Sequence, residues 1–77
     1  MRFTIYSKDN CPWCDRAKQI LESLNFKYIE YRLGDNLLRE EFIEQFGDTA
    51  TFPRIFCGDD LVGGCTDLIL WVQATQS

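Results

Sequence analysis

The stretch that decides the fold is residues 2–24, which read RFTIYSKDNCPWCDRAKQILESL. Apolar and polar side chains alternate around Phe3 and Ile5, which predicts a short strand over residues 2–7. Pro12 then stands where a helix tolerates a missing N–H, at its first position. Apolar residues follow with the spacing i, i+3, i+4, i+7, which predicts a helix over about residues 12–24: Ala17, Ile20, Leu21 and Leu24.

The rest of the chain predicts three further strands and two further helices. An aromatic-rich strand spans residues 27–33 after a stop at Asn25, and a helix marked by Leu38, Phe42, Ile43 and Phe46 ends near Gly47. A loop over residues 48–52 precedes a strand at 54–57, a tight turn at 58–60 and a return strand that begins at 61–62. A final helix runs from Thr66, with a hydroxyl and a carboxylate in its first turn.

This order of elements predicts an α/β fold with the sequence β-α-β-α-β-β-α. A βαβ unit makes its two strands parallel, and the hairpin adds an antiparallel half. We therefore expect one domain over residues 1–77, with a four-stranded mixed sheet flanked by three helices that lie on both of its faces. The expected core consists of Phe3, Ile5, Ile20, Leu21, Leu24, Ile29, Phe42, Phe46, Ile55, Leu68, Leu70 and Trp71.

Composition excludes several classes of protein. Apolar residues make up 45% of the chain, which is too many for intrinsic disorder, yet no run approaches the ~18 apolar residues of a membrane span. Eight basic and twelve acidic residues give a net charge of -4, which argues against nonspecific nucleic-acid binding. The chain has no His, so catalysis or metal binding by His is excluded.

Cysteine usage indicates the compartment. Four Cys in 77 residues fall below the roughly 8–10% that marks a secreted disulfide scaffold. Residues 1–8 contain no apolar block of signal-peptide length. We expect a cytoplasmic protein whose thiols are mostly reduced, where a close Cys pair is more often redox-active or metal-binding than structural.

The motif that carries chemistry is Cys11-Pro12-Trp13-Cys14, placed between the first strand and the first helix. At a helix N-terminus, free backbone N–H groups and the positive end of the dipole favour an anion. Such sites lower a thiol pKa from near 8.5 to about 3.5–7.5, so Cys11 is biased toward the thiolate, and Lys8 adds a nearby positive charge. Cys14 follows one helical turn later, close enough to form a disulfide with Cys11.

Three other interpretations compete with a catalytic dithiol: a zinc site, a buried inert pair and a structural disulfide. Zinc needs two further ligands, but Cys57 and Cys65 have seven residues between them and there is no His. A Cys-x-x-Cys motif near a βαβ pattern is a known redox signature, which favours the catalytic dithiol.

Two weaker motifs each allow a structural and a functional interpretation. In Thr51-Phe52-Pro53, the proline either merely precedes an edge strand or forms a cis bond that presents the Phe52 backbone to an extended peptide. Residues 63–67, Gly-Gly-Cys-Thr-Asp, are either a plain helix start or a helix N-terminus whose amides bind a substrate carboxylate.

Taken together and in this order, the three motifs resemble those of glutaredoxins, the glutathione-dependent oxidoreductases of the thioredoxin-like fold. The resemblance implies that Cys11 is the nucleophile and Cys14 the resolving thiol. It further implies a glutathione site made by Lys8, Trp13, Phe52, Pro53, Cys65, Thr66 and Asp67. The chain departs from the family pattern at Trp13, usually Tyr or Phe, and at Ala50, where many members have a basic residue; Arg54 is the other cation that could assist Lys8.

The resemblance implies reduction of protein disulfides and of glutathione mixed disulfides by a monomer, with glutathione as co-substrate and no metal required. Its partners would be disulfide-containing or glutathionylated proteins, with ribonucleotide reductase as one candidate. Two alternatives stay open: a redoxin that thioredoxin reductase reduces and that serves ribonucleotide reductase, and a carrier of a [2Fe–2S] cluster ligated with glutathione. Cys57 is expected to be a small core residue.

Overall fold

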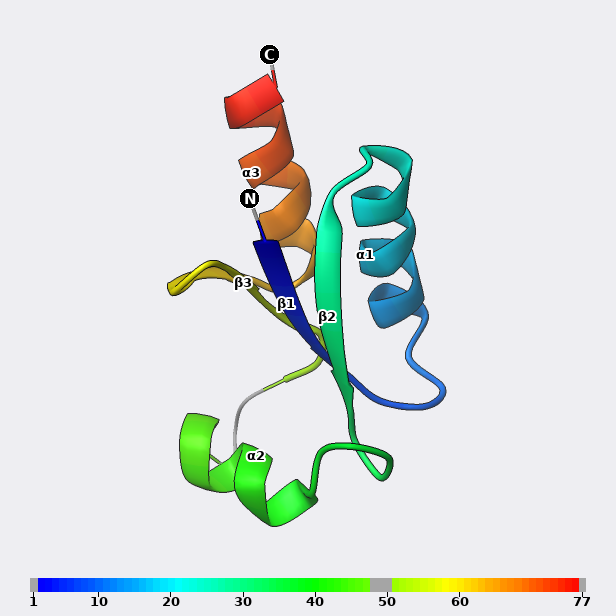
Figure 1. Cartoon of the computed structure of the whole chain (residues 1–77), viewed down its shortest axis with the longest axis vertical. Coiled ribbons are helices and arrows are strands. Elements are labelled where there is room, and N and C mark those ends of the chain that lie inside the picture. Colours follow the sequence, from blue (N-terminus) through cyan, green and yellow to red (C-terminus); the bar gives the residue numbers. More distant parts are fainter. Residues whose placement is uncertain (1, 48–50, 77) are drawn as a thin grey trace.

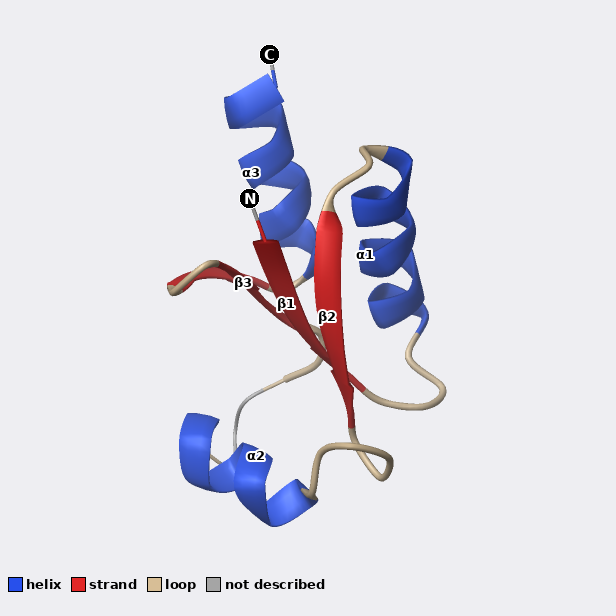
Figure 2. Cartoon of the chain, viewed as in Figure 1, coloured by secondary structure: helices blue, strands red, loops and turns tan. Residues whose placement is uncertain are grey.

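The computed structural model describes residues 2–47 and 51–76, and seven regular elements lie within them (Figures 1 and 2). The bounds of the elements are β1 Arg2–Ser7, α1 Pro12–Ser23, β2 Lys27–Arg32, α2 Arg39–Phe46, β3 Arg54–Cys57, β4 Asp60–Gly63 and α3 Cys65–Gln76. The strands form one sheet in the order β2-β1-β3-β4. β1 is parallel to β2 and antiparallel to β3, and β3 is antiparallel to β4.

The predicted α/β architecture is confirmed, with its element order and its mixed sheet. The boundaries move by a residue: β2 stops at Arg32, and α3 begins at Cys65 instead of Thr66. Asn25 ends the first helical segment as expected, with a left-handed φ of 59° that lets Phe26 N donate to Leu21 O. Residues 48–50 of the predicted loop, Ala50 among them, lie outside the described residues.

The main core fills the space between the sheet and the pair α1 and α3, which lie together in Figure 1. β1 contributes Phe3 and Ile5, because alternate residues of a strand point to the same face. The edge of the Trp71 ring meets the Phe3 ring at a centroid distance of 5.3 Å. The buried residues of this core are Phe3, Ile5, Ala17, Leu21, Ile55, Cys65 and Leu68.

The other face of the sheet carries an aromatic cluster that attaches α2. Tyr6 points opposite to Ile5 and meets the Phe46 ring at 5.0 Å and the Phe42 ring at 6.1 Å between centroids. Phe46 also lies 5.8 Å from Phe56 of β3. The helices therefore lie on both faces, as expected, and α2 covers one end of its face (Figure 2).

Two residues of the expected core are exposed, so that part of the prediction is wrong. Ile29 is 41% exposed because it pairs with Thr4, on the sheet face opposite α1 and α3, beyond the reach of α2. Leu70 is 58% exposed because α3 turns Leu68 and Trp71 toward the sheet. No helix within the described residues has both the length and the apolarity to cross a bilayer.

The two leucines Leu21 and Leu70 give a matched test of this assignment. Leu21 is fully buried, so Leu21→Ala should lower the free energy of unfolding by about 3 kcal/mol through lost burial and a residual cavity. Leu70→Ala should change it by no more than about 0.5 kcal/mol, since the side chain is exposed and alanine is a good helix former. Urea denaturation measures both variants; equal losses would contradict the assignment.

Candidate active site

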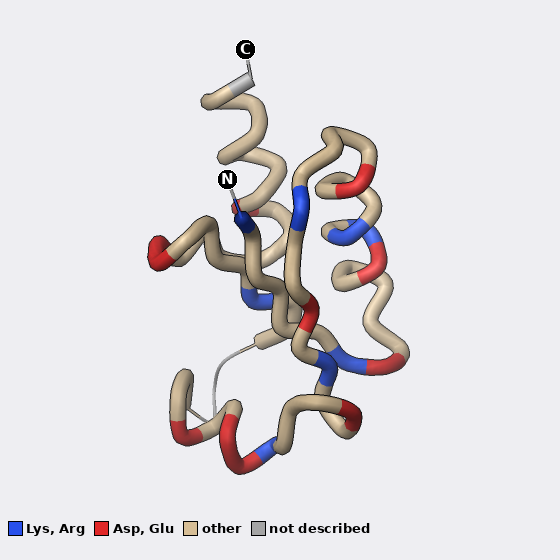
Figure 3. The backbone as a smooth tube through the Cα atoms, in the orientation of Figure 1, with Lys and Arg blue, Asp and Glu red and all other residues tan. Residues whose placement is uncertain are grey.

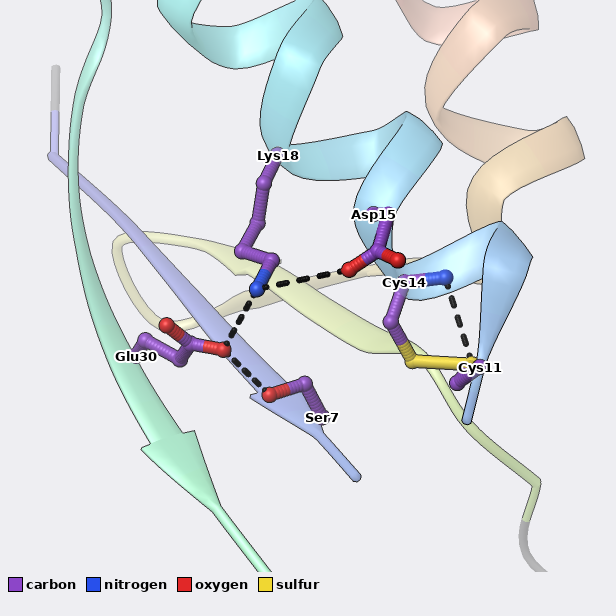
Figure 4. The surroundings of a disulfide bond; sticks show 6 residues. All are labelled: Ser7, Cys11, Cys14, Asp15, Lys18 and Glu30. Carbon is purple, nitrogen blue, oxygen red and sulfur yellow. Dashed lines mark hydrogen bonds and ion pairs between the residues drawn. A yellow bond between two sulfur atoms is a disulfide. The ribbon is translucent and has the colours of Figure 1, made fainter. Parts of the chain in front are cut away.

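The Cys11–Cys14 pair lies at the N-terminus of α1 and forms a disulfide, with the two Cα atoms 5.2 Å apart (Figure 4). Cys11 is the N-cap residue, with an extended φ of -122°, and Pro12 is the first helical residue. The Cys14 amide donates to Cys11 Sγ at 3.2 Å, so the sulfur occupies the place that a Ser or Asp oxygen takes in an ordinary cap. In the reduced protein, the same amide at the helix N-terminus would favour a negative charge on Cys11.

The two sulfur-bearing residues differ in their access to solvent. Cys14 is 0% exposed, whereas Cys11 retains 7% exposure. The cause is the register of α1, whose buried face consists of Cys14, Ala17 and Leu21. Cys14 is therefore part of the packed face of the helix, and Cys11 is the less buried of the two cysteines.

Sheet topology brings the Thr51-Phe52-Pro53 segment to the same end of the molecule. β1 and β3 are antiparallel neighbours, and Tyr6 near the end of β1 pairs with Arg54 at the start of β3. The chain that leaves β1 for Cys11 and the chain that enters β3 from Pro53 therefore lie at one edge. The Phe52–Pro53 peptide bond is cis, as the functional interpretation of this motif requires, and Pro53 is buried.

The start of α3 is built around the Asp67 carboxylate. Gly64 N donates to Asp67 Oδ2 at 3.0 Å, and Gly64 O accepts from Leu68 N at 2.9 Å. Gly63 has a φ of 120°, and a Cβ at this position would collide with the Asp67 carboxylate, so glycine is required here. The helix-start interpretation is thus observed at Asp67, which accepts from the Gly64 amide, and carboxylate binding by the first amides of α3 stays a prediction.

These segments and Trp13, which stands between the two cysteines in the sequence, line an open hollow of about 210 Å³. Trp13, which is 56% exposed, and the start of α3 both contribute to its walls. The lining residues are Trp13, Thr51, Phe52, Pro53, Gly64, Cys65, Thr66 and Asp67. Six of the seven residues predicted to bind the ligand, all except Lys8, are therefore brought together.

Lys8 lies next to this hollow, on the ring of Phe52. Its Nζ is 5.5 Å from the ring centroid, within the range of a cation–π interaction. The Phe42 ring of α2 stacks on the same ring at 4.3 Å with an interplanar angle of 18°. Sequence reasoning missed this support by Phe42, because the two residues are joined only through tertiary packing. The Arg54 guanidinium lies instead over Phe46, 5.1 Å from its centroid.

The other two cysteines, Cys57 and Cys65, pack within the fold. Burial raises the pKa of Cys65, and the charge of Arg16 only partly opposes this, so Cys65 stays a protonated thiol in the wall of the hollow. Cys57 of β3 is half-buried and packs against the main core. Within the described residues, no three His, Cys, Asp or Glu side chains gather in a way that could hold a metal ion.

A polar network beneath α1 is the feature that the sequence did not reveal (Figure 4). Ser7, 1% exposed, donates from Oγ to Glu30 Oε2 at 2.5 Å, and Lys18 Nζ lies 3.0 Å from the same oxygen. Partial burial raises the pKa of Glu30, but the hydrogen bonds from Ser7 and Lys18 and the charge of Lys18 outweigh it, so the net pKa is lowered. Glu30 is therefore a carboxylate at neutral pH.

Comparisons with known proteins agree with this geometry. The family model described as Glutaredoxin matches residues 3–62. Glutaredoxin 3 of Escherichia coli strain K12 is 43% identical over 65 residues, which cover 83% of this chain and 77% of that protein. The crystal structure of glutaredoxin 1 from Francisella tularensis has a TM-score of 0.81 at 28% identity and covers 97% of this chain and 95% of that one.

A solution structure of reduced Escherichia coli glutaredoxin is similar to the same degree. Its TM-score is 0.79 at 28% identity, and the match covers 99% of this chain and 98% of that one. The residues matched by the family model include Cys11, Cys14 and Pro53, the three positions that define the geometry of the site.

Proposed function

The chain belongs to the glutaredoxin family and is a thiol–disulfide oxidoreductase, and we propose that glutathione is the reductant that turns it over. The observation that carries the proposal is the hollow lined by Trp13 of the Cys11–Cys14 motif, by the Phe52-Pro53 segment and by the N-terminus of α3, with Lys8 next to it. The Phe52-Pro53 segment, the helix N-terminus and Lys8 would bind the cysteinyl, γ-glutamyl and glycyl parts of a γ-glutamyl-cysteinyl-glycine tripeptide. The same site would serve protein disulfides and glutathione mixed disulfides.

The cysteinyl and γ-glutamyl parts of glutathione would be bound by the chain segments that line the hollow. The Phe52 backbone would hydrogen-bond the cysteinyl residue as an added strand, which aims its sulfur at Cys11. The first amides of α3, at Cys65 and Thr66, would bind the α-carboxylate of the γ-glutamyl part, and the positive end of the helix dipole would strengthen that contact. Asp67, the one charged residue of α3 (Figure 3), would bind its ammonium group.

The glycyl carboxylate would bind at Lys8. The ammonium group of Lys8 rests on the Phe52 ring, and Phe42 holds that ring from α2. This arrangement keeps the cation beside the peptide edge while leaving it in contact with water. The aromatic stack thus limits the freedom that a surface lysine must otherwise lose when it binds an anion.

The chemistry proceeds by exchange of disulfides. The Cys11 thiolate attacks one sulfur of the substrate, a new S–S bond forms, and the other sulfur leaves as a thiolate that takes up a proton. From a glutathionylated protein, Cys11 takes the glutathione, and a second glutathione releases it. From a protein disulfide, Cys14 attacks the mixed disulfide at Cys11 Sγ and forms the Cys11–Cys14 bond; two glutathione molecules then restore the dithiol.

A coupled assay with glutathione, NADPH, glutathione reductase and a glutathione mixed disulfide tests the proposal. We expect NADPH oxidation that depends on both the protein and glutathione. A parallel reaction contains NADPH and thioredoxin reductase without glutathione. Reduction only in that second reaction would overturn the choice of glutathione. We also propose that the protein works as a monomer in the cytoplasm, where a reduced glutathione pool exists.

The two cysteines should separate the two classes of substrate. Cys11→Ser should abolish reduction of both, because the nucleophile is lost while serine still caps the helix. Cys14→Ser should retain reduction of small glutathione mixed disulfides and lose most reduction of protein disulfides, for which the resolving thiol is needed. The coupled assay measures both activities; equal losses in both variants for both substrates would contradict this division of roles.

Replacement of Lys8 should weaken the binding of glutathione more than it slows the chemical step. Lys8→Ala should raise KM for a glutathione mixed disulfide by about fivefold, as expected for loss of an exposed charge contact, with little change in kcat. Lys8→Arg should retain most of the affinity, since it keeps the charge. Lys27→Ala, which removes an exposed lysine at the start of β2, is the matched control. A loss of affinity as large in the Lys27 variant would show a general effect of net charge and refute the contact.

A further inference from the structure

Ionisation of the thiol is less favourable at Cys14 than at Cys11, because Cys14 is fully buried. In the resolving step, which rests on the function proposed above, Cys14 attacks Cys11 Sγ, and its proton ends on the departing substrate thiol. The side chain is 0% exposed, and burial disfavours a thiolate. With no His in the chain, the charges packed around Cys14 must decide how readily it ionises.

Lys18 and Glu30 are the ion pair that packs against this part of α1. Lys18 follows Cys14 by four residues, so the two side chains are neighbours on one face of the helix, with Cβ atoms about 5–6 Å apart. Glu30 approaches from β2 and binds Lys18 at 3.0 Å, and the buried Ser7 of β1 fixes the same carboxylate oxygen (Figure 4). The pair is thus held in place from three elements.

Other charges nearby are exposed or already paired. On α1, the Asp15 side chain is 71% exposed and lies 3.7 Å from Lys18. From β2, Arg32 is paired with Asp9 of the loop that precedes Cys11. α3 contributes the Cys65 thiol, on which the charge of Arg16 of α1 acts, and Asp67, whose carboxylate accepts from the Gly64 amide at the helix start.

We propose that the pairing of Lys18 with Glu30, fixed by Ser7, keeps their net effect on the resolving thiol Cys14 small, so that burial keeps this thiol protonated. Lys18 alone would favour the Cys14 thiolate, and Glu30 alone would oppose it. Because the two charges are 3.0 Å apart, their effects on the sulfur largely cancel, and burial decides the outcome. Cys11 therefore ionises first and Cys14 stays protonated, so a mixed disulfide with glutathione persists long enough for a second glutathione to release it. Both residues are positioning residues, since they act through Cys14.

The test follows Cys14 directly in the full chain that carries Cys11→Ser, which removes coupling between the two thiols. The pH dependence of the Cys14 13Cβ resonance gives the ionisation midpoint. Glu30→Gln leaves Lys18 opposed only by the exposed Asp15 carboxylate and should lower the midpoint by about one pH unit. Lys18→Met leaves Glu30 unopposed and should raise it by about as much. The matched control is Glu22→Gln. It removes the carboxylate that accepts from the Tyr28 hydroxyl, another contact between α1 and β2, about two helical turns beyond Cys14.

The double variant Glu30→Gln/Lys18→Met separates an electrostatic role from a structural one. With both charges gone, the midpoint should return to within about 0.3 pH units of the parent. Midpoints that stay unchanged in both single variants, or that move in the same direction in both, would overturn the proposal. A Cys14 midpoint that departs further from the parent value in the double variant than in either single variant would also overturn the proposal. The outcome is independent of the coupled assay, so failure of this inference is distinguishable from failure of the proposed reductant.

Discussion

The structure depends on one contact, the hydrogen bond from the Cys14 amide to Cys11 Sγ at the start of α1. It assigns to sulfur the role that a capping oxygen has in other helices, and thereby places a potential anion at the positive end of a helix dipole. Pro12 is compatible with this position because the first helical amide has no partner within the helix. The main core holds β1, which precedes this contact in the chain, and the buried face of α1, which follows it.

Sheet topology turns this helix start into a binding site. Since β3 runs antiparallel to β1, the segment around Pro53 reaches the same edge as the loop that carries Cys11. The β3–β4 hairpin then returns the chain so that the first turn of α3 lines the same hollow as Trp13. Three segments far apart in sequence thus supply sulfur, peptide edge and helix amides within one small region. Next to this region, Lys8 and Phe42 both contact the Phe52 ring.

The sequence allowed correct prediction of the features that depend on local spacing. The alternation in residues 2–7 and the apolar spacing in residues 12–24 predicted the first strand and helix, whereas the cis bond at Pro53 was one of two interpretations of its motif until the resemblance favoured it. Features that depend on register could not be foreseen. Ser7 and Glu30 are 23 residues apart and meet only because β1 and β2 pair in parallel. Ile29 and Leu70 look like core residues by composition, yet the helices cover other positions.

The central claim is that the α1 N-terminus pushes Cys11 toward the thiolate, and the pH dependence of its alkylation tests this most directly. The measurement uses fully reduced protein carrying Cys14→Ser, iodoacetamide as reagent, and peptide mapping to separate Cys11 from Cys57 and Cys65. We expect a midpoint between about 3.5 and 7.5, well below the value near 8.5 of a free cysteine. A midpoint at that free value would contradict it.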